Sequence, residues 1–328
     1  MLMKMNWALV AELVLSLVIM ALLLNYAGIG DVVQVISRIR PEWLALALVF
    51  FFCVHLAMAQ RIGIILSYLG SPKPYADVLK SHLAGMLASD FTPARSGYFT
   101  TAFALERNHR VPLEKAMISI LGPQMLDFTL KVVTGTIAVW YLVSFYLPKE
   151  SNTGVFIFAG VVAIGGMVAI GLLAMFSKTF AGFISFVRMF PFGDRAHDLL
   201  LKMQDNSHAI QRLLPQLLGL LLITWTFKAL SWWLMAEALG IRPEVSFPLV
   251  VFFAFLQPLT TMLEFVPTPT LAGMGISEAG SSAVLVLFGV PLGAAVSYAV
   301  IIRFFSIAID TLGAREAVKA LKLAGPAG

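Results

Sequence analysis

The sequence predicts an all-α polytopic membrane protein with six full spans and two re-entrant Pro/Gly-broken hairpins, arranged as inverted repeats. Hydrophobic residues make up 59% of the 328 residues and charged residues only 12%, whereas soluble domains carry about 25% charged residues. Mean hydropathy is +0.88. Several apolar runs are long enough to cross the roughly 30 Å of hydrocarbon in a bilayer. Two short stretches rich in proline and glycine interrupt such runs at corresponding places in the two halves.

The first half of the chain, residues 1–148, is predicted to be the first repeat. The N-terminal apolar run is longer than the core of a signal peptide and lacks a small-residue cleavage site, so we expect it to remain as an uncleaved span. The apolar stretches then predict three spans and one re-entrant hairpin, at about 7–27, 43–67, 76–106 (the hairpin) and 115–146.

The second half, residues 149–328, repeats this order after a polar turn at 148–153. A basic segment over 178–213 has apolar residues between its charges, which is typical of interfacial helices. The predicted spans and the second hairpin lie at about 154–177, 215–239, 246–289 (the hairpin) and 292–313.

The lysines and arginines predict the orientation. They gather in 106–115, in 178–213 and in the C-terminal tail, and loops rich in these residues stay in the cytoplasm. Both termini are therefore expected to be cytoplasmic, in a multi-pass protein of the cell membrane, with 148–153 and 240–246 outside. Arg38 and Arg40 fall on the outer side and disagree with this assignment.

The two interruptions have nearly the same sequence. Asp90-Phe-Thr-Pro93 opens the first and Glu264-Phe-Val-Pro267 the second. Proline and glycine break helices, and broken backbone at membrane depth survives only where protein or a water-filled cavity satisfies its polar groups. Paired breaks in the two halves are a sign of a transporter's binding site. The residues assigned to this re-entrant motif are Asp90, Pro93, Gly97, Glu264, Pro267, Pro269, Gly273 and Gly275.

Ionisable residues inside the predicted spans are the candidates for substrate binding, because such groups are costly in a membrane and usually mark pathways or internal pairs. They are Arg95, Asp127, Lys131, Lys228, Glu278 and Arg303. Asp127 and Lys131 are four residues apart on one helix and are expected to pair. Glu278 is expected to pair with Arg95 or Arg303. These pairs leave a surplus of cations, which favours an anionic ligand such as a lipid phosphate; the alternative is a network that only holds the repeats together.

Other chemistry finds little support in the sequence. The single cysteine, Cys53, excludes an intrachain disulfide and a cysteine-based zinc site. The five histidines show no metal-ligand spacing, so no metal and no cofactor are expected. His55 is expected to pack against polar neighbours. The net charge of +5 is explained by cytoplasmic loops, and nucleic-acid binding is not required.

Three features resemble a known family: Pro93-Ala-Arg-Ser-Gly97, the Pro-x-Pro stretch that leads to Glu278, and Arg303 in the last span. They resemble the flippase-like integral membrane family related to the transmembrane region of lysylphosphatidylglycerol synthases. The resemblance implies lipid translocation or the handling of lipid-linked sugars. Tyr98 stands where that family usually has a glutamate. Synthases of this type also carry a soluble aminoacyl-transferase domain, which is not expected within these residues.

The sequence therefore favours a transporter, and not an enzyme, that moves an anionic phospholipid or a polyprenyl-phosphate-linked lipid between leaflets. One alternative is a membrane-embedded transferase. Transferases of this kind usually have aspartates at the membrane surface. Asp194, Asp198 and Asp205 are weak candidates, because a solvated helix face also explains their positions. Another alternative is a scaffold for a lipid-modifying enzyme, and such an enzyme is a possible partner in either case.

Overall fold

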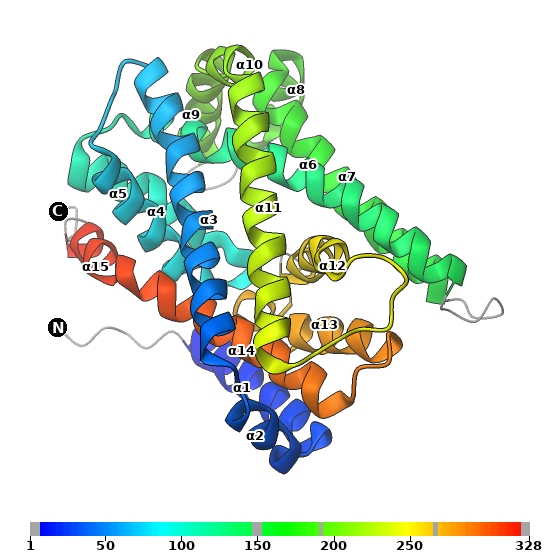
Figure 1. The fold of residues 1–328 in the computed structure, drawn as a ribbon. Coiled ribbons are helices and arrows are strands. Elements are labelled where there is room, and N and C mark those ends of the chain that lie inside the picture. Colours follow the sequence, from blue (N-terminus) through cyan, green and yellow to red (C-terminus); the bar gives the residue numbers. More distant parts are fainter. Residues whose placement is uncertain (1–6, 146–152, 190–192, 265–267, 323–328) are drawn as a thin grey trace. The chain divides into compact units, whose positions relative to one another are not determined.

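The computed structural model describes residues 7–145, 153–189, 193–264 and 268–322, and within these ranges every regular element is a helix (Figure 1). The chain divides into two compact units. Unit 1 comprises residues 1–54, 86–98 and 225–311, and unit 2 comprises residues 55–85, 99–224 and 312–328. Because both units draw on both halves of the chain, this division does not test the repeats 1–148 and 149–328, which stay a prediction.

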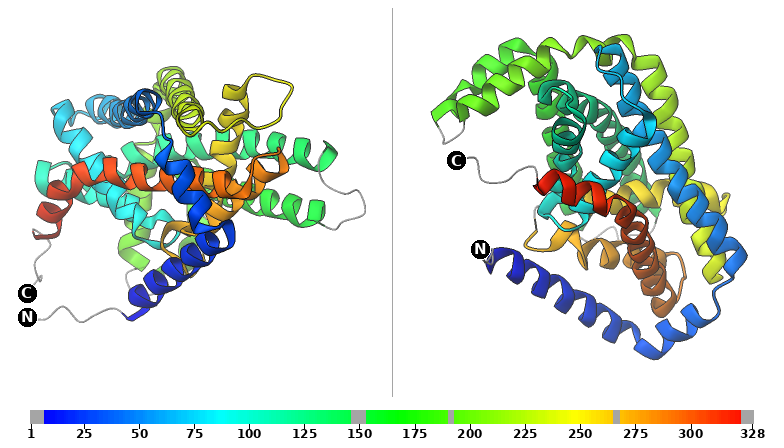
Figure 2. Two further views of the ribbon diagram at one scale, coloured as in Figure 1. Left: turned by 60° about the horizontal axis from the view of Figure 1, so that its bottom comes forward. Right: turned by 90° about the vertical axis from the view of Figure 1, so that its left-hand side faces the viewer.

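Unit 1 holds the two helix breaks. Its elements are α1 (Trp7–Ala27), α2 (Ile29–Ser37), the start of α3 (Pro41–Tyr68), the end of α4 (Tyr75–Asp90), η1 (Pro93–Phe99), most of α11 (Leu214–Leu239), α12 (Leu249–Glu264), η3 (Leu271–Gly273), α13 (Ile276–Leu287) and α14 (Leu292–Asp310). Helix α13 packs against both α12 and α14, and α14 also packs against α1 and α2. Figure 2 shows this part of the chain from two further sides.

Unit 2 is built around α6 (Leu113–Phe145), which packs along α7 (Thr153–Phe176) (Figure 1). The described residues of the segment predicted to be interfacial, 178–213, form short helices. The remaining elements are α5 (Thr100–His109), α8 (Lys178–Phe183), η2 (Ile184–Met189), α9 (Gly193–Asp205), α10 (His208–Arg212), η4 (Thr311–Gly313) and α15 (Ala314–Lys322). His55 and His82, both buried, approach each other between α3 and α4, with 3.4 Å between their ring nitrogens.

The helices confirm a polytopic all-α membrane protein. Among the described residues, five helices are long and apolar enough to cross a bilayer: Val10–Ala27, Pro41–Tyr68, Leu113–Phe145, Leu214–Leu239 and Leu292–Ala320. The predicted span at 154–177 is α7, of which Gly165–Phe176 is a shorter apolar helix. Large apolar side chains such as Leu13, Leu17 and Leu22 on α1 are exposed, as expected of a surface that faces lipid.

The predicted half-spans are separate helices that end at the breaks. Helices α4 and α12 stop at Asp90 and Glu264, the acidic residues that open the two motifs. Their re-entrant path through a bilayer stays a prediction. Pro267 and residues 148–152 of the polar turn lie outside the described residues.

Candidate functional site

The first break is a tight reversal after α4. Ala94 and Arg95 have φ values of 50° and 53°, a left-handed conformation that is rare for residues other than glycine. Thr92 stabilises the turn, because its hydroxyl accepts a hydrogen bond from the Gly97 amide at 2.6 Å. A Cβ atom at Gly97 would overlap the carbonyl group of Ala88, so only glycine fits there. Strained backbone of this kind persists where the surrounding structure enforces it, and it clusters at functional sites.

The second break repeats this geometry. Ala272 has a φ of 46°, and Gly273 and Gly275 also have positive φ values. Glu278, in the first turn of α13, accepts a hydrogen bond from the Gly275 amide at 2.6 Å. This contact caps the new helix and uses the favourable position of a carboxylate at a helix N-terminus.

The two breaks contact each other within unit 1. The backbone amide of Ala272 donates a hydrogen bond to the carbonyl oxygen of Thr92 at 3.3 Å. The Leu271 amide donates to the hydroxyl of Ser16 on α1 at 2.9 Å. Backbone groups left open by two broken helices are thus satisfied partly by one another, which is the condition for broken backbone inside a membrane protein.

Five charged side chains form one chain of ion pairs across the breaks, which we call the break network: Asp90, Arg95, Glu264, Arg303 and Glu278. Arg95 contacts Asp90 at 2.7 Å and Glu264 at 2.5 Å. Arg303 contacts the other oxygen of Glu264 at 3.3 Å and Glu278 at 2.6 Å. All five are nearly buried, the most exposed being the Arg95 side chain at 13%. Acids and bases alternate, and Glu264 joins the two arginines.

Two further polar side chains belong to this site. Ser277 accepts a hydrogen bond from Arg303 at 2.7 Å. Asp310, at the end of α14 and fully buried, lies beside Asp90 and interacts with Arg95. Asp310 was not singled out in the sequence. Its signal was available, since it follows Arg303 by seven residues, two turns along the same helix face.

The structure brings together some of the predicted site residues and assigns others elsewhere. Arg95, Glu278 and Arg303 meet in unit 1, and Glu278 takes Arg303, one of its two predicted partners. Asp127 and Lys131 form the predicted pair at 2.8 Å, but in unit 2. Lys228 lies partly buried on α11 of unit 1 and is not one of the five linked residues.

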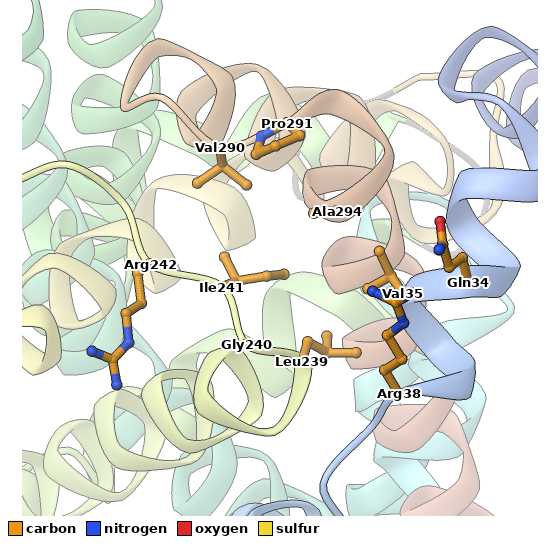
Figure 3. Close-up of a pocket in the computed structure, with 10 residues that line it drawn as sticks. All are labelled: Gln34, Val35, Arg38, Leu239, Gly240, Ile241, Arg242, Val290, Pro291 and Ala294. Carbon is orange, nitrogen blue, oxygen red and sulfur yellow. The ribbon is translucent and has the colours of Figure 1, made fainter.

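A cavity of about 360 Å³ lies elsewhere in unit 1, and no member of the break network lines it (Figure 3). Its walls are Gln34, Val35, Arg38, Leu239, Gly240, Ile241, Arg242, Val290, Pro291 and Ala294. Arg242 and the neighbouring Arg40 share one carboxylate, that of buried Glu237, at 3.4 and 3.2 Å. The Arg40 side chain is 42% exposed and that of Arg242 72%.

The sequence model of the family described as "Lysylphosphatidylglycerol synthase TM region" matches residues 9–314. The chain belongs to this family. The match includes both breaks and every residue of the break network. The chain is also similar to a UPF0104 membrane protein of Methanocaldococcus jannaschii, with 23% identity over 159 residues, which is 44% of this chain and 47% of that protein. The aligned part is thus about half the length of this relative.

Proposed function

We propose that this family member moves a phosphate-bearing lipid between leaflets, with the headgroup taking the place of Glu264 between Arg95 and Arg303. The observation that supports this is the bridging contact: two guanidinium groups bind the two oxygens of one carboxylate. A phosphate presents oxygens with similar spacing and suits the forked donors of arginine. The Glu264 side chain is 10% exposed. Among the described residues its carboxylate forms ion pairs only with its two arginines, so it is the member that a ligand can displace.

The position of the site between two broken helices supports transport over simple binding. In secondary transporters, substrate sites lie near the bilayer midplane where discontinuous helices from two repeats meet. A headgroup that crosses there loses its water, and the arginines replace that hydration. The lipid tails remain in the bilayer throughout.

The charge count refines the expected mechanism. The sequence predicted a surplus of cations, but the break network contains three carboxylates and two guanidinium groups, and Asp310 adds another carboxyl group. The closed network therefore offers no spare positive charge to an anion. A phosphate must compete with Glu264, and each passage would open and re-form the Arg–Glu contacts. A scaffold protein whose ion pairs only hold its helices together would show the same complete pairing. A scaffold is therefore the second candidate function.

A flux assay separates the two candidates. In vesicles that contain the purified protein and a fluorescent anionic phospholipid, we expect transfer between leaflets by the wild type. Arg303→Lys should retain part of it, since the forked contact is lost but the charge is kept. The double variant Arg303→Gln/Glu278→Gln removes both members of one ion pair, so neither position keeps an unpaired charge. It should abolish transfer.

Arg242→Ala is the matched control, because this arginine lies outside the break network, and it should leave transfer unchanged. No transfer by the wild type, or full transfer by the double variant, would favour the scaffold.

We also propose that both termini face the cytoplasm, as the basic loops indicate. In a Cys53→Ser background, a cysteine at exposed Ser246 should react with a membrane-impermeant reagent from outside, and a cysteine at exposed Arg195 should not. The opposite labelling would reverse the orientation.

A further inference from the structure

Arg61, on α3 of unit 2, is a buried arginine that forms no ion pair with any described residue. Its residue exposure is 2%. Its Nε and Nη1 atoms are buried and have no hydrogen-bond partner in the described part of the chain. Burying an unpaired charge costs several kcal/mol. The guanidinium group of arginine keeps its positive charge in proteins.

The next turn of α3 belongs to an apolar core of unit 2. One turn further along α3, Ile65 is fully buried in a core with Ile118 on α6 and Leu217 on α11. Two hydroxyl groups of unit 2, those of Ser81 and Thr101, are also buried without a partner among the described residues. A neutral hydroxyl can be satisfied by a water molecule, but a guanidinium group needs a counter-charge.

The place of Arg61 along its helix suggests where that counter-charge comes from. Arg61 precedes the end of α3 at Tyr68 by seven residues, which is roughly 10 Å along the helix axis. Under the proposed orientation this end of α3 is cytoplasmic. Arg61 then lies near the boundary between headgroups and acyl chains of the inner leaflet.

We propose that Arg61 binds a phosphate group, supplied by an anionic phospholipid of the inner leaflet or by free phosphate. Arg61 belongs to unit 2 and the break network to unit 1, and the Arg61 proposal does not depend on the proposed transport. The phosphate supplies the charge that the surrounding side chains do not, through the paired N–H groups of the guanidinium.

Thermal melting of purified, delipidated protein tests the site. The probes are phosphatidylglycerol and phosphatidylcholine in mixed micelles, and inorganic phosphate at matched ionic strength. We expect phosphatidylglycerol, and not phosphatidylcholine, to raise the Tm of the wild type. Arg61→Met should abolish that rise and should melt above the wild type in neutral detergent, because it removes an uncompensated charge. Arg61→Lys should keep part of the rise.

Arg195→Met, at an exposed position of α9 in the same unit, is the matched control and should retain the full response. A response to inorganic phosphate that Arg61→Met also abolishes would identify a free anion as the ligand. The proposal is overturned if Arg61→Met keeps the rise with phosphatidylglycerol, melts below the wild type in neutral detergent, or fails to fold.

Discussion

The two breaks share a backbone geometry but differ in how their charges are held. Each follows an acidic helix end and contains an alanine in a left-handed conformation, Ala94 in the first and Ala272 in the second. In the second break, Glu278 caps the next helix and also holds Arg303. Residues 93–99 of the first break contain no carboxylate.

The two breaks also contribute opposite charges to the ion pairs. The first break supplies an arginine, Arg95, which reaches the acid that closes α12. The second break supplies acids, which hold Arg303 of α14. The second break is fixed by the Glu278 cap. The first is held by its Thr92–Gly97 and Asp90–Arg95 contacts, and the proposed headgroup would replace only its Arg95–Glu264 pair. We infer that the first break is the part that moves when the network opens.

The largest expected effect comes from removing the two arginines in turn. Arg303→Ala leaves Glu278 without its cation and Glu264 with only one, and breaking a buried pair in this way costs about 3–5 kcal/mol. Arg95→Ala should cost less, because its side chain is the most exposed of the five. Melting temperatures in neutral detergent would measure both variants, with Arg242→Ala as the control. Equal losses for Arg95→Ala and Arg303→Ala would contradict the asymmetry of the two breaks.

The two acids that contact Arg303, Glu264 and Glu278, should respond differently to neutralisation. Glu264→Gln removes the competitor for a phosphate while Asp90 and Glu278 still hold the arginines. We expect anionic lipid to bind on the order of tenfold more tightly, equivalent to about 1.4 kcal/mol, and to be transferred more slowly because release is slower.

Glu278→Gln is the comparison for Glu264→Gln, since it weakens the cap of α13 and should lower stability without a gain in affinity. Lipid retention measured by native mass spectrometry would separate them. Weaker lipid binding by Glu264→Gln would argue against displacement of this carboxylate.

The tight turn of the first break gives a smaller effect. Gly97→Ala places a methyl group against the carbonyl of Ala88, and overpacking of this kind costs about 1–3 kcal/mol. Gly160→Ala, in α7, meets nothing within 4 Å and should be neutral. If the first break moves during transport, Gly97→Ala should reduce lipid transfer more than its loss of stability explains. Transfer that merely follows the fraction of folded protein would indicate a static turn.

The sequence was sufficient to predict the helices and the breaks, because apolar length and the proline and glycine positions depend on local chemistry. The predicted spans match the helices closely, and the Asp127–Lys131 pair follows from helix periodicity. The contact between Arg95 and Glu264 spans 169 residues and depends on the tertiary approach of the two breaks. Asp90 and Glu264 were therefore recognised as motif residues and not as ion-pair partners.

Two buried charges, Asp310 and Arg61, were not predicted, for a common reason. Each lies towards the C-terminal end of an apolar helix, and charged residues near helix ends commonly reach the membrane interface. Periodicity cannot tell a side chain that reaches the interface from one enclosed by neighbouring helices. Their burial, 0% for Asp310 and 2% for Arg61, is set by tertiary packing.

The smallest expected effect concerns Asp310, which adds a carboxyl group beside Asp90 in the first break and has no counterpart assigned in the second. Asp310→Asn keeps the shape of the side chain and removes the repulsion between neighbouring carboxylates. We expect a rise in Tm of a few degrees, which corresponds to about 1 kcal/mol for a protein of this size, and little change in lipid transfer. Asp194→Asn on the exposed face of α9 is the control and should leave the Tm unchanged. A large fall in Tm or a loss of transfer in Asp310→Asn would mean that this carboxylate is an essential partner of Arg95. The first break would then be fixed by Asp90 and Asp310 as firmly as the second is by Glu278, and the inferred difference in mobility between the two breaks would be wrong.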